Sequence, residues 1–402
     1  MKAPTLELGD IFRFHGPAYL TTLGGSLSHE QQQALRAIAV CRTAALGGRL
    51  DQCDKCGYRK IAYCSCRNRH CPKCRGQARA RWLAERAAEL LPVEYFHVVF
   101  TVPQLLAPLA LQNQRLVYGI LFRAAAETLL EIAADPKHLG AHIGFLAVLH
   151  TWGQNLYHHP HLHCVVPGGG IAPDQSRWIS CRRRFLFPVR VLSRLFRAKF
   201  VAYLKAAFRD GKLGFYGELK LLEQKRNFIE WLTKVVGTEW VVYAKPPFGG
   251  PQQVLKYLAR YTHRVAISNQ RLVSLEGGRV TFRWKNYARA SETATMTLQV
   301  EEFIRRFLLH VLPKGLVRVR HFGFLANRCR RKRVELCRSL LEPRASQPPG
   351  LDRDRDAPSE EQASTVDRCP RCKVGSMRPV EILVRQMFAT TALASSPQID
   401  SS

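Results

Sequence analysis

The chain has few acidic residues for its length. It contains 31 aspartates and glutamates against 61 lysines and arginines among 402 residues, which gives a formal net charge of +30. An enzyme for small neutral substrates has no use for so strong a positive field, whereas binding to nucleic acid depends on one. The composition therefore predicts a nucleic-acid partner. The alternative is a generic basic protein or one that associates with ribosomes.

Long apolar runs are also missing. No stretch reaches the roughly 20 consecutive apolar residues that a membrane-spanning helix needs. The N-terminal sequence MKAPTLELGDIFRFHG lacks the charged and then apolar order of a secretory signal. We therefore expect a cytoplasmic protein with no membrane partner. In that compartment its 13 cysteines are expected to be metal ligands or buried thiols, not disulfides.

The apolar residues that are present predict a mixture of strands and helices, an α+β fold. Alternation predicts strands at 95–102, 143–153, 161–170 and 239–247. Helical periodicity predicts helices at 29–47, 76–91, 104–134, 190–208, 219–235, 251–264 and 300–312. Residues 271–287 read as a β-hairpin whose turn is Glu276–Gly277–Gly278.

Six of the cysteines lie between residues 53 and 74. CDKC and CPKC form two CxxC pairs, Cys53–Cys56 and Cys71–Cys74, separated by 14 residues. Each pair presents two thiolates from one tight turn, and the gap allows the chain to fold back and close a tetrahedron. We predict that Cys53, Cys56, Cys71 and Cys74 bind one structural zinc ion. A redox dithiol is the alternative, although no thioredoxin-like βαβ pattern surrounds the pairs.

Further potential ligands flank these pairs. Three lie between them and are compatible with a second metal or an alternative fourth ligand: Cys64, Cys66 and His70. A later pair, Cys369–Cys372, has no second CxxC beside it. Cys329 and Cys337 are candidates to complete that site, or are ordinary helix residues.

Arginines crowd the same cysteine-rich segment: Arg67, Arg69, Arg75, Arg79 and Arg81. A zinc knuckle that carries arginines is suited to contact DNA phosphates. We therefore predict that Arg67, Arg69 and Arg75 bind DNA. The alternative is a solvated positive face with no partner.

Two histidines in the stretch YHHPHLHCVV, residues 157–166, are separated by one leucine. In a strand, His161 and His163 share one face, about 7 Å apart, and two neutral imidazoles at that spacing can converge on a metal. The alternative is that one of the two histidines has a structural role and the other has no role in binding a metal. By the same alternation the preceding strand places His150 and Gln154 on one face. Both are candidates for a third ligand because the register of the loop is unknown, and we include Gln154 in the predicted metal site.

Two tyrosines lie four residues apart in KYLARYTHR, on a predicted helix. Tyr257 and Tyr261 therefore share one helix face, which usually indicates a core aromatic stripe. Here the stripe is surrounded by cations: Lys256, Arg260, His263 and Arg264. Tyrosine is a competent covalent nucleophile when a metal and nearby cations polarise a phosphate. We predict catalytic roles for both tyrosines and DNA contacts for Lys256, Arg260 and Arg264.

Together these motifs resemble the two-tyrosine HUH transposases of the insertion sequence 91 family, bacterial relatives of the helitron transposases. The matching stretches are CRNRHCPKC, LHTWGQNL, HPHLHCVVPGGG, YLARYTHRVAISN and HVLPKGLVRVRHFGFLANR, in the family's order. The resemblance implies a small zinc-binding domain followed by an HUH endonuclease domain with an antiparallel, ferredoxin-like sheet. It implies that His161 and His163 hold Mg²⁺ or Mn²⁺ and that Tyr257 and Tyr261 are the nucleophiles.

The resemblance also implies a function. The chain would cleave single-stranded DNA at element ends and target and transfer strands through 5′-phosphotyrosine intermediates, in rolling-circle-type transposition. No P-loop or helicase motif is present, so host replication or helicase machinery would unwind the duplex. A replication initiator or relaxase-like nickase is the nearest alternative. A non-catalytic zinc-containing DNA-binding repressor is another.

The resemblance and the composition together predict four segments. They are an N-terminal helical and zinc-binding domain (1–91), the catalytic domain (92–290), a basic helical region (291–341) and a disordered linker and tail (342–402). The last segment is rich in Pro, Ser, Asp and Arg, and it contains the Cys369–Cys372 pair as a possible knuckle.

Overall fold

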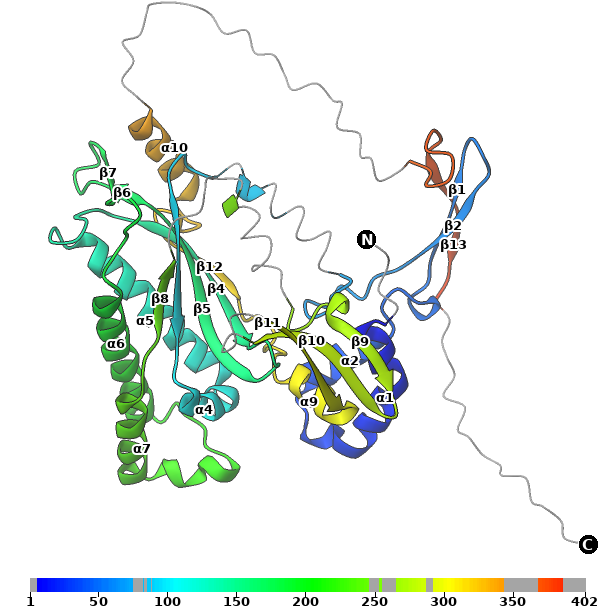
Figure 1. Cartoon of the computed structure of the whole chain (residues 1–402), viewed down its shortest axis with the longest axis horizontal. Coiled ribbons are helices and arrows are strands. Elements are labelled where there is room, and N and C mark those ends of the chain that lie inside the picture. The colour runs from blue at the N-terminus through cyan, green and yellow to red at the C-terminus, as the bar shows by residue number, and fades with distance from the viewer. Residues whose placement is uncertain are drawn as a thin grey trace, which may run out of the picture.

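A computed structural model describes residues 6–74, 82, 85–87, 89–245, 253–254, 265–286, 292–342 and 368–385. Within these residues the largest element is a five-stranded sheet with helices on one face. A three-stranded sheet packs with helices from the N-terminal region. Another three-stranded sheet combines segments from both ends of the chain (Figure 1).

The five-stranded sheet has the order β12-β4-β5-β3-β8, and every neighbouring pair is antiparallel. Its strands are β3 (Tyr95–Thr101), β4 (Gly144–Trp152), β5 (His158–Pro167), β8 (Val242–Lys245) and β12 (Val319–Gly323). Four of the five were predicted. The edge strand β12 was not, and it falls in the region that the sequence assigned to a separate basic helical segment.

Alternation along these strands produces two different faces. Phe96, Val98 and Phe100 of β3 belong to the main apolar core together with alternate residues of β4 and β5. That core is closed by the helices α4 (Ala107–Gln112), α5 (Gln114–Ala134), α6 (Val189–Arg209) and α7 (Lys225–Gly237). The remaining residues of each strand point to the opposite face of the sheet.

Strand β5 begins at His158, three residues before the predicted start. The hydroxyl of Tyr118 on α5 and Nε2 of His158 share a hydrogen bond of 2.8 Å. Burial lowers the pKa of His158 to about 4, so its ring is neutral at pH 7. This contact fixes His158 on the helix side, and the residues of opposite parity, including His161 and His163, lie on the other side.

The smaller sheet has the order β11-β10-β9. Its strands are β9 (Leu272–Glu276), β10 (Arg279–Asn286) and β11 (Glu292–Gln299), and the predicted hairpin β9–β10 turns at Gly277–Gly278, both with positive φ. One apolar cluster joins this sheet to α1 (Leu8–Leu23), α2 (His29–Ala39) and α9 (Val300–Leu308). The unit therefore combines residues from the predicted first, second and third segments, and the predicted boundaries at 91 and 291 do not follow the packing.

Helix α2 is shorter than the predicted helix 29–47. Ser28 caps its first turn through the backbone N–H of Gln31, and the helix ends at Ala39. Arg42 then adopts a φ of +56°, and the chain turns so that the Cys41 side chain points toward other cysteines. The helix is shortened because Cys41 takes part in a cluster of thiols.

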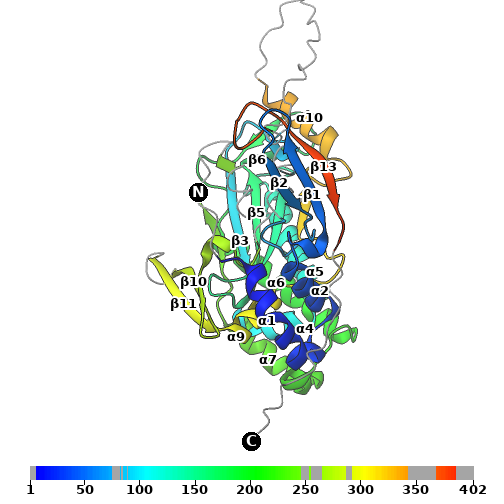
Figure 2. The ribbon, with the colours of Figure 1, turned by 90° about the vertical axis from the view of Figure 1, so that its right-hand side faces the viewer.

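The third sheet has the order β13-β1-β2 and was not predicted. It consists of β1 (Gly48–Cys53), β2 (Arg59–Tyr63) and β13 (Met377–Leu383), and Figure 2 shows β13 beside β1. The tail was predicted to be disordered, but residues 368–385 are part of this sheet and its adjoining turns. Helix α10 (Arg330–Leu341) precedes the part of the tail that lies outside the described residues.

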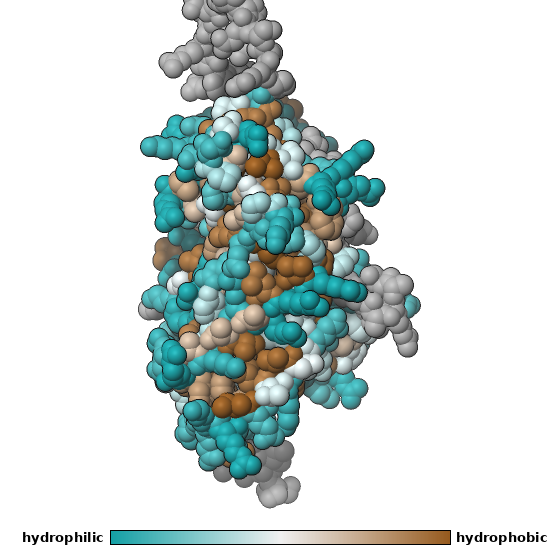
Figure 3. Space-filling view, turned by 90° about the vertical axis from the view of Figure 1, so that its left-hand side faces the viewer, coloured by the Kyte–Doolittle hydropathy of each residue, from teal (hydrophilic) through white to brown (hydrophobic). Residues whose placement is uncertain are grey.

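The surface carries apolar side chains in separate patches. Figure 3 shows these patches surrounded by hydrophilic side chains on the side that lies to the left in Figure 1. Interspersion of this kind is ordinary for a folded protein. In the portion of the chain that the structure describes, no helix is both long and apolar enough to cross a membrane.

Candidate metal centres

Three histidines meet on the face of the central sheet opposite the helices α4, α5, α6 and α7. One ring nitrogen each of His150, His161 and His163 lies within 4.8 Å of the others. His150 on β4 is directly opposite His161 on β5, and His163 follows two residues later on the same face. Only 2% of His150 and 8% of His163 is exposed. The arrangement places three imidazole nitrogens around one point, as a metal site requires.

Hydrogen bonds set the orientation of two of these rings. Nδ1 of His161 donates to the backbone carbonyl of His159 at 2.7 Å, because a carbonyl can only accept. The proton of His161 is therefore on Nδ1 and the lone pair on Nε2. Nδ1 of His163 and Nε2 of His97 are 2.8 Å apart. The second nitrogen of each ring is thus held by the protein, as is usual for metal-ligating histidines.

Gln154 lies beyond the end of β4, where the regular alternation has been interrupted. The β4–β5 register shifts between His150 and Trp152, so strict alternation does not continue past His150. Strand β4 ends at Trp152, and Gln154 lies in the following turn, where its carbonyl accepts a hydrogen bond from Arg271. Of the two candidates for the third ligand, His150 is brought to His161 and His163 by the structure, and Gln154 stays a prediction.

Sequence reasoning did not identify His97. It lies on β3 with only 3% of its surface exposed, and its ring stacks on that of His163 at 5.0 Å between centroids. The signal was present as the single polar residue in the strand YFHVVF. Interpreting it required the β3–β5 pairing, which the sequence alone does not provide.

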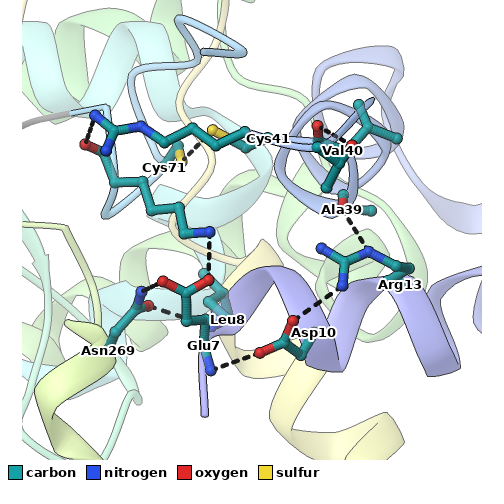
Figure 4. Close-up of polar contacts among 12 residues, drawn as sticks. Glu7, Leu8, Asp10, Arg13, Ala39, Val40, Cys41, Cys71 and Asn269 are labelled. Carbon is teal, nitrogen blue, oxygen red and sulfur yellow. Dashed lines mark hydrogen bonds and ion pairs between the residues drawn. The ribbon is translucent and has the colours of Figure 1, made fainter. Parts of the chain in front are cut away.

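The cysteines form two clusters, which corrects the single tetrad predicted from the sequence. The first contains Cys41, Cys66, Cys71 and Cys74. In this cluster, Sγ of Cys41 is 3.5 Å from the sulfurs of both Cys71 and Cys74. Figure 4 shows the sulfurs of Cys41 and Cys71 facing each other.

The second cluster contains Cys53, Cys56, Cys369 and Cys372. The two predicted CxxC pairs therefore belong to different clusters, because β1 and β2 carry the Cys53–Cys56 turn away from Cys71 and Cys74. Neither Cys329 nor Cys337 completes the C-terminal pair. Cys337 is buried in a separate apolar cluster, and Sγ of Cys329 faces backbone carbonyls. Cys64 and His70 belong to neither cluster, and Nε2 of His70 accepts a hydrogen bond from a backbone amide.

Polar contacts join the first cysteine cluster to α1 and to the smaller sheet (Figure 4). Glu7, at the start of α1, forms an ion pair with Lys73 between Cys71 and Cys74. Asn269 accepts a hydrogen bond from the backbone N–H of Leu8 at 3.2 Å. The cluster is therefore part of the structural unit that includes α1 and β9, and it is not a separate module.

The side chain of Arg69 forms hydrogen bonds within the protein. Its guanidinium donates to three backbone carbonyls, those of Leu312, Pro313 and Leu316, at 3.1, 3.0 and 2.8 Å. Its prediction as a DNA contact is therefore not supported by its geometry. Arg67 is exposed and stays a predicted DNA contact.

We expect replacement of Arg69 by glutamine to lower the free energy of unfolding by about 1–3 kcal/mol, since three carbonyls lose a charged donor. The matched variant Arg67→Gln should change it by less than about 0.5 kcal/mol, because the side chain is on the surface. Urea unfolding measures both. Equal stability of the two variants would contradict the assigned role of Arg69.

The two tyrosines and several predicted cations lie outside the described residues: Tyr257, Tyr261, Arg75, Lys256, Arg260 and Arg264. The beginning of their predicted helix is described, however, and residues 253–254 are helical. Val254 is fully buried against Leu146, Val148 and Val165. These three residues lie on the same face of the sheet as the histidine cluster.

Comparison with known proteins gives two matching family profiles. One is described as "Putative transposase" and matches residues 144–333, and the other is described as "Transposase zinc-binding domain" and matches residues 11–102. The first range includes the three histidines and both tyrosines. The second includes the first cysteine cluster and the Cys53–Cys56 pair.

Two curated relatives extend the match over most of the chain. The chain is 55% identical over 381 residues to "Putative transposase y4qJ" from Sinorhizobium fredii, across 94% of this chain and 95% of that protein. It is 28% identical over 327 residues to "Transposase for insertion sequence element IS801" from Pseudomonas savastanoi pv. phaseolicola, across 77% and 74%. No solved structure matches the chain. The family resemblance read from the motifs is confirmed, and the chain belongs to the insertion sequence 91 family of transposases.

Proposed function

We propose that this transposase cleaves and rejoins single-stranded DNA at a site formed by the histidine cluster and by Tyr257 and Tyr261. The observation that carries the proposal is the convergence of His150, His161 and His163 on the face of the sheet opposite α4 to α7. Three imidazoles can hold a divalent cation, which the family resemblance gives as Mg²⁺ or Mn²⁺. When bound, the cation would polarise the scissile phosphate.

His97 supports this site as a positioning residue. A histidine that binds a cation through Nε2 must carry its proton on Nδ1. Nδ1 of His163 would then donate to Nε2 of His97, at the observed 2.8 Å. The stacked, buried ring of His97 holds His163 in this tautomer and orientation.

The position of Val254 supports the assignment of the tyrosines. On a continuous helix, Tyr257 and Tyr261 follow Val254 by three and seven residues and share its face. Val254 is buried against the histidine-bearing face of the sheet. Seven helical residues span about 10 Å, and the four residues from Leu146 to His150 span about 14 Å of strand. The tyrosines would thus reach the region of a phosphate held at the histidines.

The proposed chemistry exchanges one phosphodiester for another. The tyrosine oxygen attacks phosphorus and loses its proton, the bond from phosphorus to the 3′ oxygen breaks, and that oxygen takes up a proton as a 3′-hydroxyl. The 5′-phosphate remains on tyrosine, so a 3′-hydroxyl of another strand can later displace it without ATP. Two tyrosines would allow two strands to be attached at once.

The direct test is incubation with single-stranded DNA from an element end and Mn²⁺, followed by a denaturing gel. A covalent protein–DNA adduct is expected, and its absence with every divalent cation would favour the non-catalytic DNA-binding alternative. Transfer of a strand between two different DNA molecules would separate a transposase from a replication initiator or nickase.

Binding of single-stranded DNA should weaken steeply with salt. Each neutralised phosphate contributes about −0.7 to the slope of log affinity against log salt on single strands, so five contacts would give about −3.5. The net charge of +30 motivates this expectation. Fluorescence anisotropy between low and physiological salt measures the slope. A slope near zero would mean that the basic surface serves another partner.

A further inference from the structure

The second cysteine cluster joins two turns that are far apart in the sequence. Sγ of Cys53 lies 3.7 Å from Sγ of Cys372, and Sγ of Cys56 lies 3.6 Å from Sγ of Cys369. Four thiolates at about 2.3 Å from one zinc ion form a tetrahedron with edges of about 3.8 Å. A disulfide would need about 2.05 Å. The observed separations therefore fit a shared zinc ion.

The two turns have the same backbone design. In each, the N–H two residues after the first cysteine donates to that cysteine's sulfur at 3.4 Å. In each, the N–H four residues after the first cysteine donates to its carbonyl, at 3.2 Å from Gly57 and 2.9 Å from Lys373. Both of these donors have positive φ, +68° and +61°. Amides directed at sulfur stabilise thiolates, the form that binds zinc.

The turns also contact each other directly. The N–H of Ser376 donates to the Asp54 carboxylate at 2.9 Å, and the N–H of Asp54 donates to the carbonyl of Ser376 at 3.1 Å. A Cβ on Gly375 would lie 2.5 Å from Sγ of Cys53 and 2.7 Å from the Asp54 carboxylate. Residue 375 therefore has to be glycine for the turns to approach this closely.

We propose that Cys53, Cys56, Cys369 and Cys372 bind a second zinc ion that fastens the C-terminal segment to the N-terminal zinc-binding region. Residues 368–385 then supply half of a metal site and the third strand of its sheet. They lie outside both matched family profiles, which cover 11–102 and 144–333. The proposal stands independently of the DNA cleavage proposed above.

Burial explains why strand pairing alone would be a weak attachment. Strand β13 pairs with β1 from Leu383 to Met377, but its side chains are mostly exposed. Val380 is 54% and Ile382 82% exposed. A strand that buries so little apolar surface gains little from the hydrophobic effect, and small sheets of this kind depend on metals or other cross-links. The zinc ion would close a loop of more than three hundred residues.

Metal content tests the proposal in the full-length protein. Native mass spectrometry should detect two zinc ions bound by cysteine in the wild type and one in the variant Cys369→Ser/Cys372→Ser. The variant Cys53→Ser/Cys56→Ser should lose the same zinc ion. A variant that combines all four cysteine substitutions should also lose only this zinc ion and keep the other. Substitution with Co²⁺ separates thiolate sites from the histidine site, since only thiolates give sulfur-to-metal absorption. That absorption should halve in each variant.

Two controls make the result specific. Cys329→Ser with Cys337→Ala, which removes the other two C-terminal cysteines, should leave zinc content unchanged. Gly375→Ala should weaken zinc binding without removing a ligand, because its Cβ collides with Cys53. An unchanged zinc count in Cys369→Ser/Cys372→Ser would overturn the proposal. So would a wild-type mass lower by four hydrogens, which would indicate two disulfides.

Attachment itself can be measured with a specific protease site inserted between residues 343 and 367. After cleavage, the C-terminal fragment should stay bound to the rest of the protein in zinc and leave on addition of a strong chelator. In the Cys369→Ser/Cys372→Ser background it should leave without the chelator. Retention of the fragment in that background would show that strand pairing alone holds the C-terminal segment in place. The proposed role of the second zinc ion would then be wrong.

Discussion

Replacing His161 with alanine is expected to reduce cleavage of single-stranded DNA by about a thousandfold or more. The proposed cation is expected to contribute several kcal/mol to stabilising the transition state, and about 4 kcal/mol corresponds to three orders of magnitude in rate. His161→Ala removes one of the three proposed ligands, and its ring is only partly buried, so the fold should be preserved. His163→Ala should have an equal or larger effect on cleavage, because it also breaks the contact with His97. The measurement is the single-turnover cleavage rate, with DNA affinity and thermal stability measured in parallel.

The matched control is His159→Ala. His159 is on the same strand. Its ring shares a hydrogen bond with Gln104 and lies 5.4 Å from the ring of His161, but it is not one of the three clustered histidines. Its backbone carbonyl, which accepts from His161, remains in the variant. We therefore expect cleavage within a few-fold of wild type. Partial recovery of His161→Ala at high Mn²⁺ would agree with a weakened metal site. Wild-type cleavage rates in both His161→Ala and His163→Ala would remove the histidine cluster from the mechanism.

His97 gives a finer test of the same site. If it positions His163, His97→Gln should raise the Mn²⁺ concentration needed for half-maximal cleavage, by about 10- to 100-fold. The maximal rate at saturating Mn²⁺ should change much less. A purely structural role would instead lower thermal stability without altering the metal dependence.

The sequence predicted the parts of these sites that depend on local spacing. His161 and His163 share a face because strand residues alternate, and the structure places them as alternation requires. The third ligand was uncertain for the same reason, since one irregular step between His150 and Trp152 ends the alternation. His97 could not be assigned, because its contact with His163 arises from pairing between strands that are 66 residues apart.

The cysteines also show that sequence spacing does not predict contacts between distant parts of the chain. Each CxxC was recognisable from its own four residues. Which pairs lie together is decided by long-range pairing of β1 with β13, which brings together residues separated by 319 positions. The tetrad predicted from proximity in sequence was wrong for this reason. Arg69 was also misassigned, since composition cannot distinguish an arginine that faces DNA from one that binds backbone carbonyls.

Substitution of Tyr257 and Tyr261 is also expected to have a large effect on DNA cleavage and strand transfer. Replacement of either by phenylalanine removes the nucleophilic oxygen and keeps the ring. We expect each single variant to form some covalent adduct with single-stranded DNA, because on the predicted helix the other tyrosine would share the same face and reach the same phosphate. Complete strand transfer should fail in both, since it requires two strands attached at once. The double variant should form no adduct.

The two readings of the tyrosine pair lead to opposite results. If the tyrosines only extend the apolar stripe that begins at the buried Val254, phenylalanine would fit equally well and transposition would continue in all three variants. If one single variant transposes normally and the other is inactive, the enzyme uses a single nucleophile and the two-attachment scheme is wrong. Mass spectrometry of the DNA-linked tryptic peptide identifies which oxygen carries the phosphate. In the wild type the adduct should be found on both residues, because in the proposed mechanism either oxygen attacks a phosphate held at His161 and His163.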